Sequence, residues 1–285
     1  MKKRSQKNLW QEKHTPPEVT RLKLGCNTVL FNQLDLYGAL QHVSWAGYDG
    51  VELAFLGNMA QHIQANTDES YLDEVRSAAR KHGLGLYAIE ASGTKEEMAK
   101  IFEVASKLGI PIIAIGSGGK SGDAEQTEKA FKYIRELAEI AKTWGTTLAV
   151  KPHVGASIYN TETALQFLRS MDSPSVGINF DPSHLHRAGD DAAWAALKLG
   201  DRIVHCHFRD CPHRAQSPGL PEQQIPGRGE IDIMAVLHAL KEVGYNRVLD
   251  LEVIGAFTYP LSKQMGIASE SRGYLYRCLQ ELRLT

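Results

Sequence analysis

The sequence predicts a single α/β domain, a (β/α)8 (TIM) barrel, from three observations. Alternating helical stretches and short apolar runs are typical of a parallel sheet. Eight such strand–helix units fit a chain of 285 residues. Glycine favours the position after a helix because the chain there often adopts a left-handed conformation. Six helical stretches end in this way, at Gly47, Gly83, Gly109, Gly145, Gly200 and Gly244.

The expected strands are apolar runs that begin at residues 23, 51, 84, 112, 148, 176, 203 and 248. The first runs to Val29. Each is followed by room for a helix, and the fourth helical stretch shows the expected period. Its predicted core face is Ala130, Ile134, Leu137, Ala141 and Trp144. A doubly wound open sheet is the rival, but it would show a glycine-rich turn after the first strand, where this chain has residues 30–32, Leu-Phe-Asn.

Composition narrows the classes of function. The formal charge of −1 and the pI near 6.8 give no global field that favours nucleic acid or an anionic membrane. No stretch approaches the roughly 18 to 20 apolar residues of a membrane span, and the four cysteines are too irregularly placed for a disulfide framework. We therefore expect a cytoplasmic protein with a flexible N-terminal arm at 1–20 and a barrel domain at 21–285; a homo-oligomer is left open.

The apolar runs end in chemically active side chains. Apolar residues would be expected at most of these places if only packing mattered, because burying a polar group without a partner costs several kcal/mol. The carboxyl ends of barrel strands form one face, so a shared site at that mouth is the economical explanation. These side chains are Glu52, Glu90, Lys151, His153, Asp181, His184, His205, His207 and Glu252.

The histidines and carboxylates of the last three strands form a ligand set for a metal. His205 and His207 share one face of a strand because side chains alternate along it. An Asp181-x-x-His184 segment lies one strand earlier and Glu252 one strand later. Mixed oxygen and nitrogen ligands of this kind suit Mn, Mg, Co or Zn.

The chain resembles the xylose isomerase-like (β/α)8 barrels, which are grouped as sugar phosphate isomerases and epimerases. The resemblance extends from about Leu24 to the end of the chain, and its motifs are specific for the superfamily but identify no substrate. They are AGYDGVEL at 46–53, DPSH at 181–184 with Ala188-Gly189, HCHFRD at 205–210, PGRGEID at 226–232 and LDLE at 249–252.

In that family a divalent ion is typically held by carboxylates that end strands 5, 6 and 8 and by a histidine of strand 7. The resemblance implies Asp181, His207 and Glu252 as three of these ligands, and His184 as a histidine that contacts the substrate or supports a ligand. The glutamate of strand 5 is absent, because the family's Glu-x-His reads Lys151-Pro152-His153 here.

Lys151 has three interpretations. It swings aside to bind substrate while the other ligands hold the metal, it replaces the metal as the charge that stabilises an enolate, or it is a neutral base. We favour the first, because the other three ligands are intact.

The remaining roles follow from the same site. Lys151, Glu252 and His184 are assigned to catalysis. Glu52 is expected to play a structural role at the barrel rim. Glu90 contacts substrate or replaces the missing carboxylate, the alternative being a structural residue near the third helix. The full substrate-binding set is His153, His205, Arg209 and Glu90.

The expected function is that of an isomerase or lyase acting on a small sugar, keto-sugar or cyclitol. Its hard step is removal of a proton next to a carbonyl, with the enolate charge stabilised by the metal. The alternative is a non-catalytic sugar-binding barrel that has lost the strand 5 carboxylate. A class II abasic-site endonuclease is disfavoured by the charge balance and by Lys151. The sequence names neither the sugar, the stereochemistry nor the metal.

Overall fold

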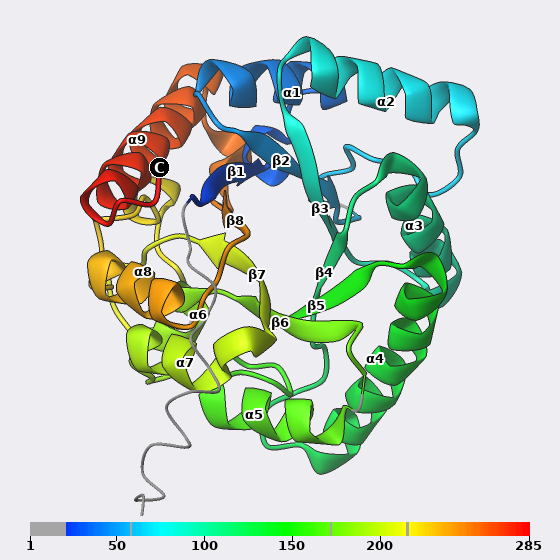
Figure 1. The fold of residues 1–285 in the computed structure, drawn as a ribbon, viewed down its shortest axis with the longest axis vertical. Helices are drawn as coiled ribbons and strands as arrows, with labels where there is room; N and C mark the ends of the chain where they lie inside the picture. The colour runs from blue at the N-terminus through cyan, green and yellow to red at the C-terminus, as the bar shows by residue number, and fades with distance from the viewer. Residues whose placement is uncertain (1–20, 58, 172, 215–216) are drawn as a thin grey trace, which may run out of the picture.

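The structure is a computed structural model that describes residues 21–57, 59–171, 173–214 and 217–285. Its strands form a closed barrel in which each strand pairs in parallel with the next and β8 pairs with β1 (Figure 1). The predicted (β/α)8 fold class is therefore confirmed, whereas the predicted flexible arm at 1–20 lies outside the described residues. The strands are β1 (Lys23–Asn27), β2 (Gly50–Phe55), β3 (Gly85–Ala91), β4 (Ile112–Gly116), β5 (Thr147–Lys151), β6 (Val176–Phe180), β7 (Ile203–Phe208) and β8 (Val248–Leu251).

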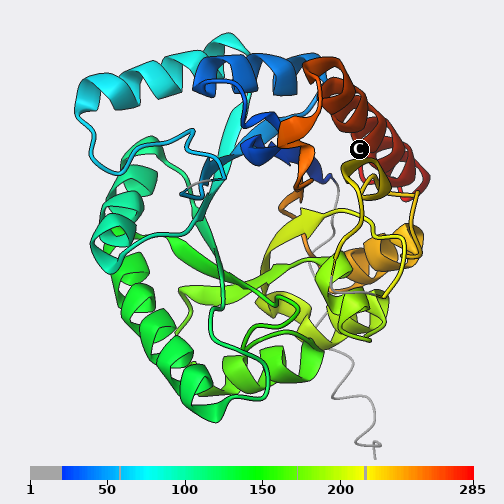
Figure 2. The same cartoon turned by 180° about the vertical axis from the view of Figure 1, so that it is seen from behind.

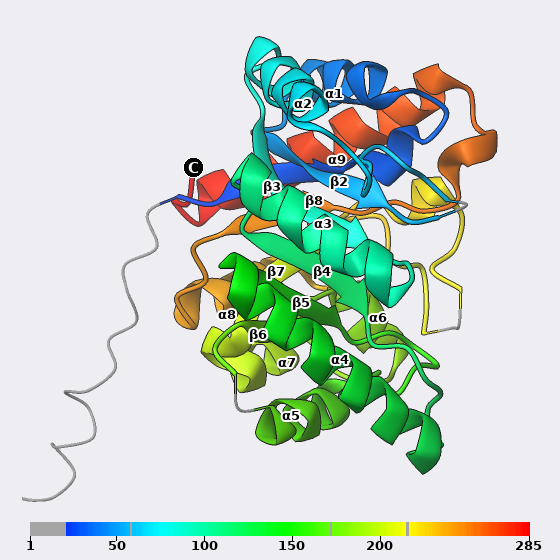
Figure 3. The same cartoon turned by 90° about the vertical axis from the view of Figure 1, so that its right-hand side faces the viewer.

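Helices between the strands surround the barrel, and the view from the other end shows the same ring (Figure 2). From the side, α2, α3 and α4 lie along the outside of the strands (Figure 3). Within the described residues, no helix is both long enough and apolar enough for a membrane span. The helices are α1 (Leu36–Trp45), α2 (Glu69–Lys81), α3 (Lys95–Leu108), α4 (Ala124–Trp144), α5 (Thr161–Ser170), α6 (Pro182–Arg187), α7 (Ala192–Leu199), α8 (Ile233–Glu242) and α9 (Leu261–Glu281).

The predicted helix ends are confirmed. Gly109 and Gly145 follow α3 and α4 in the left-handed conformation, with φ of 72° and 66°, and their N–H groups close the last turn. Four of the five residues of the predicted face of α4 are buried, with Ile134 and Leu137 fully enclosed, whereas Trp144 is half-buried. The large hydrophobic core therefore lies between the strands and the ring of helices.

Small apolar side chains and buried polar groups both line the barrel interior, which becomes polar towards the carboxyl ends of the strands. Ala88 and Ala149 belong to a small buried cluster. Two residues further along the same strands and on the same face come Glu90 and Lys151. Small apolar side chains thus lie beneath Glu90 and Lys151, and the buried Glu52, which pairs in register with Ala88, carries the polar cluster down to the same level.

One expected strand is shorter than its apolar run. Strand β1 ends at Asn27, although the apolar run continues to residue 29. Residues Thr28–Phe31 form a 3-10 helix instead. The reason is local, since the Asn27 side chain caps this helix by accepting a hydrogen bond from the N–H of Val29 at 2.9 Å. The end of β1 therefore places an amide side chain among the polar groups of the mouth.

Replacing Gly25 with alanine is expected to destabilise the fold by about 3 kcal/mol, the upper part of the range for overpacking a core. A methyl group there would stand 2.9 Å from Cγ2 of Val248 and overlap the carboxylate of Asp250. Urea denaturation measures the change. Gly116→Ala is the matched control, because a methyl group at that strand end meets no atom within 4 Å. Equal stability of the two variants would contradict the expectation.

Candidate active site at the barrel mouth

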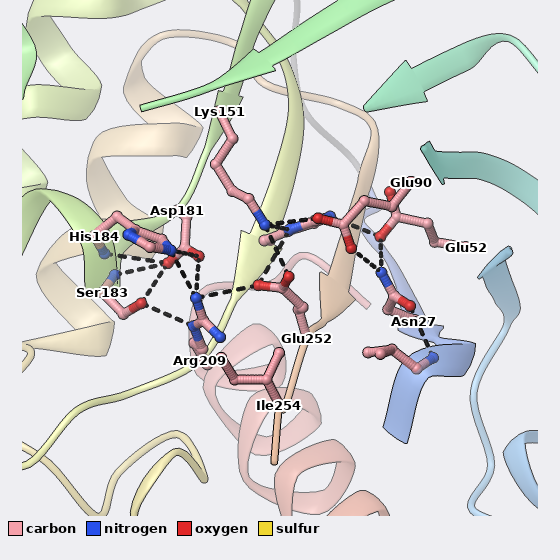
Figure 4. Close-up of polar contacts among 12 residues, drawn as sticks. Asn27, Glu52, Glu90, Lys151, Asp181, Ser183, His184, Arg209, Glu252 and Ile254 are labelled. Atoms are coloured by element: carbon pink, nitrogen blue, oxygen red, sulfur yellow. Dashed lines mark hydrogen bonds and ion pairs between the residues drawn. The ribbon is translucent and has the colours of Figure 1, made fainter. Parts of the chain in front are cut away.

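Lys151 lies at the centre of a buried polar cluster (Figure 4). It is the last residue of β5 and only 4% of its surface is exposed. Its Nζ donates hydrogen bonds to Glu90 Oε1 and to Glu252 Oε1, both at 2.8 Å. Nζ also lies 3.0 Å from Nδ1 of His207. Strands β3, β5 and β7 and the residue after β8 thus converge on one nitrogen.

Arg209 forms the second positive centre of the cluster. Its Nη2 lies 3.2 Å from Asp181 Oδ2 and 3.2 Å from Glu252 Oε2, so the guanidinium separates these two carboxylates. The same group contacts Nε2 of His184 at 2.8 Å, and its Nε donates to the hydroxyl of Ser183. Arg209 therefore joins the ends of β6, β7 and β8.

Asp181 is held by the start of α6. Its Oδ1 accepts hydrogen bonds from the N–H and hydroxyl groups of Ser183, at 2.9 and 2.7 Å, as the cap of that short helix. Its Oδ2 faces Arg209. Burial, with Arg209 close by, holds the pKa of His184 well below its usual value, so the imidazole of His184 is neutral. His153 is exposed, and its ring lies 4.1 Å from that of His184 at the outer edge of the cluster.

Glu52 lies deeper in the barrel and is completely buried. Its Oε1 is 3.1 Å from Nε2 of His205, and its Oε2 is 2.6 Å from Nε2 of His207. Asn27 Nδ2 bridges Glu52 Oε2 and Glu90 Oε2, each at 2.7 Å. The expectation of a structural role at the rim is therefore wrong in its location, because Glu52 supports both strand 7 histidines from inside the barrel.

The two carboxylates that flank Lys151 have opposite pKa shifts. Burial raises the pKa of Glu90 above its usual value, and the neighbouring Glu252 raises it further. Burial alone would also raise the pKa of Glu252, but Arg209 and Lys151 hold that pKa well below its usual value. For Lys151, burial is outweighed by Glu252 and Glu90, which raise its pKa. Its two carboxylate partners and its raised pKa favour an ammonium ion over a neutral base at Lys151.

A cavity of about 320 Å³ opens at the same mouth. This is near the lower end of the roughly 300 to 1,000 Å³ typical of small-molecule sites. It is formed by segments that follow β1, β2 and β8, and Val29 in its wall is hydrogen-bonded to Asn27 of the cluster. The lining residues are Val29, Asn32, Met59, Gly255, Ala256 and Phe257.

The long connection after β7 is anchored at its two ends. Asp210 accepts hydrogen bonds from the N–H groups of Cys211 and Gly227, both at 2.9 Å, and from that of Ile231 at 3.2 Å. Arg228 pairs with Glu270 of α9. These contacts fix how the segment leaves and rejoins the barrel beside Arg209.

The structure brings the predicted site residues into one region, and it adds three that the sequence reasoning missed as site members. Asn27 was not recognised as a site residue because it lies inside the apolar run at 23–29 that was predicted to be one strand. Asp250 is fully buried with its Oδ2 3.5 Å from Nε2 of His205, and it lies two residues before Glu252, the same spacing that singled out the strand 7 histidines. Glu52 was among the polar residues that end the apolar runs, but only a structural role at the barrel rim was expected for it. The roles of individual residues, including Asp181 as a metal ligand, stay predictions.

The model of the family described as xylose isomerase-like TIM barrel matches residues 40–278. The chain belongs to this family. The resemblance inferred from the sequence motifs is thereby confirmed. Among curated relatives, an inosose isomerase of Bacillus velezensis is 23% identical over 236 residues, which cover 76% of this chain and 83% of that protein.

Solved structures of xylose isomerase-like barrels share the fold. A D-tagatose 3-epimerase-like protein superposes with a TM-score of 0.74 at 19% identity, covering 91% of this chain and 97% of the other. The IOLI protein with a bound zinc atom gives a TM-score of 0.70 at 20% identity, covering 88% and 96%. Isomerases and sugar epimerases are thus similar to this chain at low identity.

The predicted divalent ion can be tested against the donor groups. Two donor sets within the described part of the chain have ligand atoms within 4.8 Å of one another: Glu52 with His205 and His207, and Glu90 with His207 and Glu252. These sets support a cation site at the mouth. Asp181 belongs to neither. In the second set, however, the Lys151 ammonium already contacts all three donors. The residues as arranged therefore do not fit a divalent ion at that place.

Proposed function

We propose that this protein is a sugar or cyclitol isomerase, epimerase or dehydratase that removes a proton next to the carbonyl of a small polyhydroxy ketone. The observation that carries the proposal is the pair of buried carboxylates, Glu90 and Glu252, on either side of one cation with pKa values shifted in opposite directions. Such pairs are typical of acid–base sites. The inosose isomerase relatives support this class of substrate.

Glu90 is the stronger proton acceptor of the two because its pKa is raised towards the working range of the enzyme. In the proposed step the C–H bond next to the carbonyl breaks and its proton passes to a carboxylate. The electron pair forms a C=C bond, and the carbonyl π pair moves to oxygen, which becomes the enolate oxygen. Return of the proton to the opposite face of the same carbon gives the epimer. Delivery of the proton to the former carbonyl carbon, while the hydroxyl on the deprotonated carbon loses its proton and becomes the new carbonyl, gives the isomer. Departure of the hydroxyl on the β-carbon as water, after it takes up a proton, re-forms the C=O bond and gives the dehydrated product.

Arg209 and His184 suit the orientation of hydroxyl groups. Nη1 of Arg209 is buried and makes no hydrogen bond with the described residues, which leaves a charged donor for a ligand. We assign substrate contact to His153 as well, because it is exposed and its ring lies beside that of His184. These groups supply polar and charged contacts, whereas the cavity that begins at Val29 has a more apolar lining.

Incubation of the protein with inososes and keto-sugars in D₂O tests the proposal. Proton NMR measures deuterium incorporation next to the carbonyl. Mass spectrometry distinguishes the two reactions, because isomerisation changes the mass only by the incorporated deuterium, whereas dehydration also removes the mass of one water molecule. We expect exchange with at least one substrate of this class. Calorimetric binding of a sugar without any exchange would contradict the proposal and favour the non-catalytic sugar-binding barrel.

A further inference from the structure

The Lys151 ammonium occupies the centre of a donor set that has the spacing of a metal site. Glu90, His207 and Glu252 form that set, and the Nζ of Lys151 is 2.8, 3.0 and 2.8 Å from them. Figure 4 shows the lysine nitrogen between the two carboxylates. The three donors are buried and the lysine is enclosed with them. The cluster is thus already built around a positive charge.

The neutralisation of the carboxylates is shared with Arg209. Glu252 forms ion pairs with Lys151 through Oε1 and with Arg209 through Oε2. Asp181 forms an ion pair with the same guanidinium. Lysine and arginine together bring two positive charges to this group, the formal charge of one divalent ion. No carboxylate of the predicted ligand set is left without a cation beside it.

A divalent ion and the Lys151 ammonium would compete for the same three donor atoms. If Lys151 stayed in place, its repulsion of the ion would cancel the attraction of one of the two carboxylates, because a divalent ion interacts equally strongly with either unit charge at the same distance. If Lys151 moved away, it would give up its ion pairs with both Glu90 and Glu252 inside the protein. In either case the ion would have to displace contacts that the lysine already makes.

We propose that the Lys151 ammonium is the resident cation of this site, taking the place of a divalent ion, and that it stabilises the enolate oxygen of the substrate. The inference rests on the proposed function for its chemical role, but not for the identity of the cation. In the step described above, the N–H of Lys151 hydrogen-bonds to the developing oxyanion while the transferred proton goes to a carboxylate, so Lys151 keeps its protons throughout. The contacts of Lys151 thus favour a lysine held between the two carboxylates over one that swings aside from a bound metal.

Metal binding by the full chain tests the identity of the cation without any substrate. Mn²⁺ is titrated into wild type and Lys151→Glu, and free ion is followed by electron paramagnetic resonance. Elemental analysis after dialysis against Zn²⁺ gives the stoichiometry. We expect Lys151→Glu, which restores the glutamate implied by the family resemblance, to bind Mn²⁺ at least about 100-fold more tightly than wild type. Lys142→Glu, an exposed charge reversal on α4, is the control and should behave as wild type.

The wild-type titration keeps the test decisive even if Lys151→Glu does not fold. One Mn²⁺ per wild-type chain, lost in Glu252→Gln, would overturn the proposal. Binding that persists in Glu252→Gln marks ions held elsewhere, at Glu52, His205 and His207 or on the surface, and agrees with it.

Catalytic activity provides a second test of the role of Lys151. We expect wild-type exchange in D₂O to be unchanged by EDTA in protein shown to be metal-free, and Lys151→Met to lose at least about 100-fold. Exchange that disappears with EDTA and returns with Mn²⁺ would overturn the proposal. If no substrate shows exchange at all, the proposed function fails, while the metal titration still decides which cation the site holds.

Discussion

Glu252→Gln is expected to lower the rate of solvent exchange about 1,000-fold, and Glu90→Gln to lower it by a similar factor, within the roughly 100- to 10,000-fold contribution of general acid–base catalysis. Both substitutions preserve shape and remove a group that can carry a proton. The double variant should be little worse than either single one, since groups that act in the same step are not additive. Glu281→Gln, exposed on α9, is the matched control.

The pH profile separates a proton-carrying role from a structural one. Glu252 raises the pKa of Glu90, so removing its charge should lower that pKa. If Glu90 is the base, activity is lost as the pH falls through its pKa, and the residual activity of Glu252→Gln should survive to lower pH than that of wild type. An unshifted acid limb, or full exchange in Glu90→Gln, would contradict the assignment.

Glu52→Gln is expected to destabilise the fold by about 3 kcal/mol or more, because a buried group loses its partner. Both oxygens of Glu52 accept hydrogen bonds, from His205 Nε2 at 3.1 Å and from His207 Nε2 and Asn27 Nδ2 at 2.6 and 2.7 Å. A glutamine would place N–H donors against at least one of these donors. Urea denaturation measures the loss, with Glu281→Gln as the reference. A change within experimental error of that reference would show that the buried cluster does not need the carboxylate.

The loss should depend on pH. Burial alone would raise the pKa of Glu52, but His207 and His205 lower it below the ordinary 4.5. The unfolded chain therefore takes up this proton at a higher pH than the folded one, and the stabilisation from Glu52 is complete above about pH 5 and lost as the pH falls through the folded value. Burial alone would lower the pKa of His207, but Glu52 raises it, so the stability difference between wild type and Glu52→Gln should first grow as the pH falls through the ordinary histidine value of 6.5 and then shrink below about pH 5.

Local patterns sufficed for most of the fold. Gly109 and Gly145 mark helix ends by backbone conformation alone, and the buried face of α4 follows from helical period, so both are readable within a few residues. The end of β1 was missed because the hydrophobicity of Val29 and Leu30 does not reveal that Asn27 caps a 3-10 helix. Where a polar side chain accepts a hydrogen bond from the backbone two residues further on, that polar residue marks the end of the strand better than the end of the apolar run does.

The candidate site divides in the same way. Strand alternation placed His205 and His207 on one face, and the structure agrees, since both contact Glu52. Arg209 was expected to bind substrate, but it also bridges Asp181 and Glu252 while only 1% exposed. The position of a residue at the end of a predicted strand indicates that it lies near the barrel mouth. That position does not reveal how deeply its side chain is buried or which side chains it contacts.

By itself, then, the sequence determined the barrel, the family and the end of the barrel where polar side chains gather, because helix ends, strand period and run ends are properties of neighbouring residues. Only the tertiary structure decided what Lys151 does there. Its partners Glu90 and Glu252 lie 61 and 101 residues away along the chain. Closure of the barrel sets their distances to the ammonium and hence its charge. Electrostatic energy depends on those distances in space, which the separation of residues along the chain does not encode.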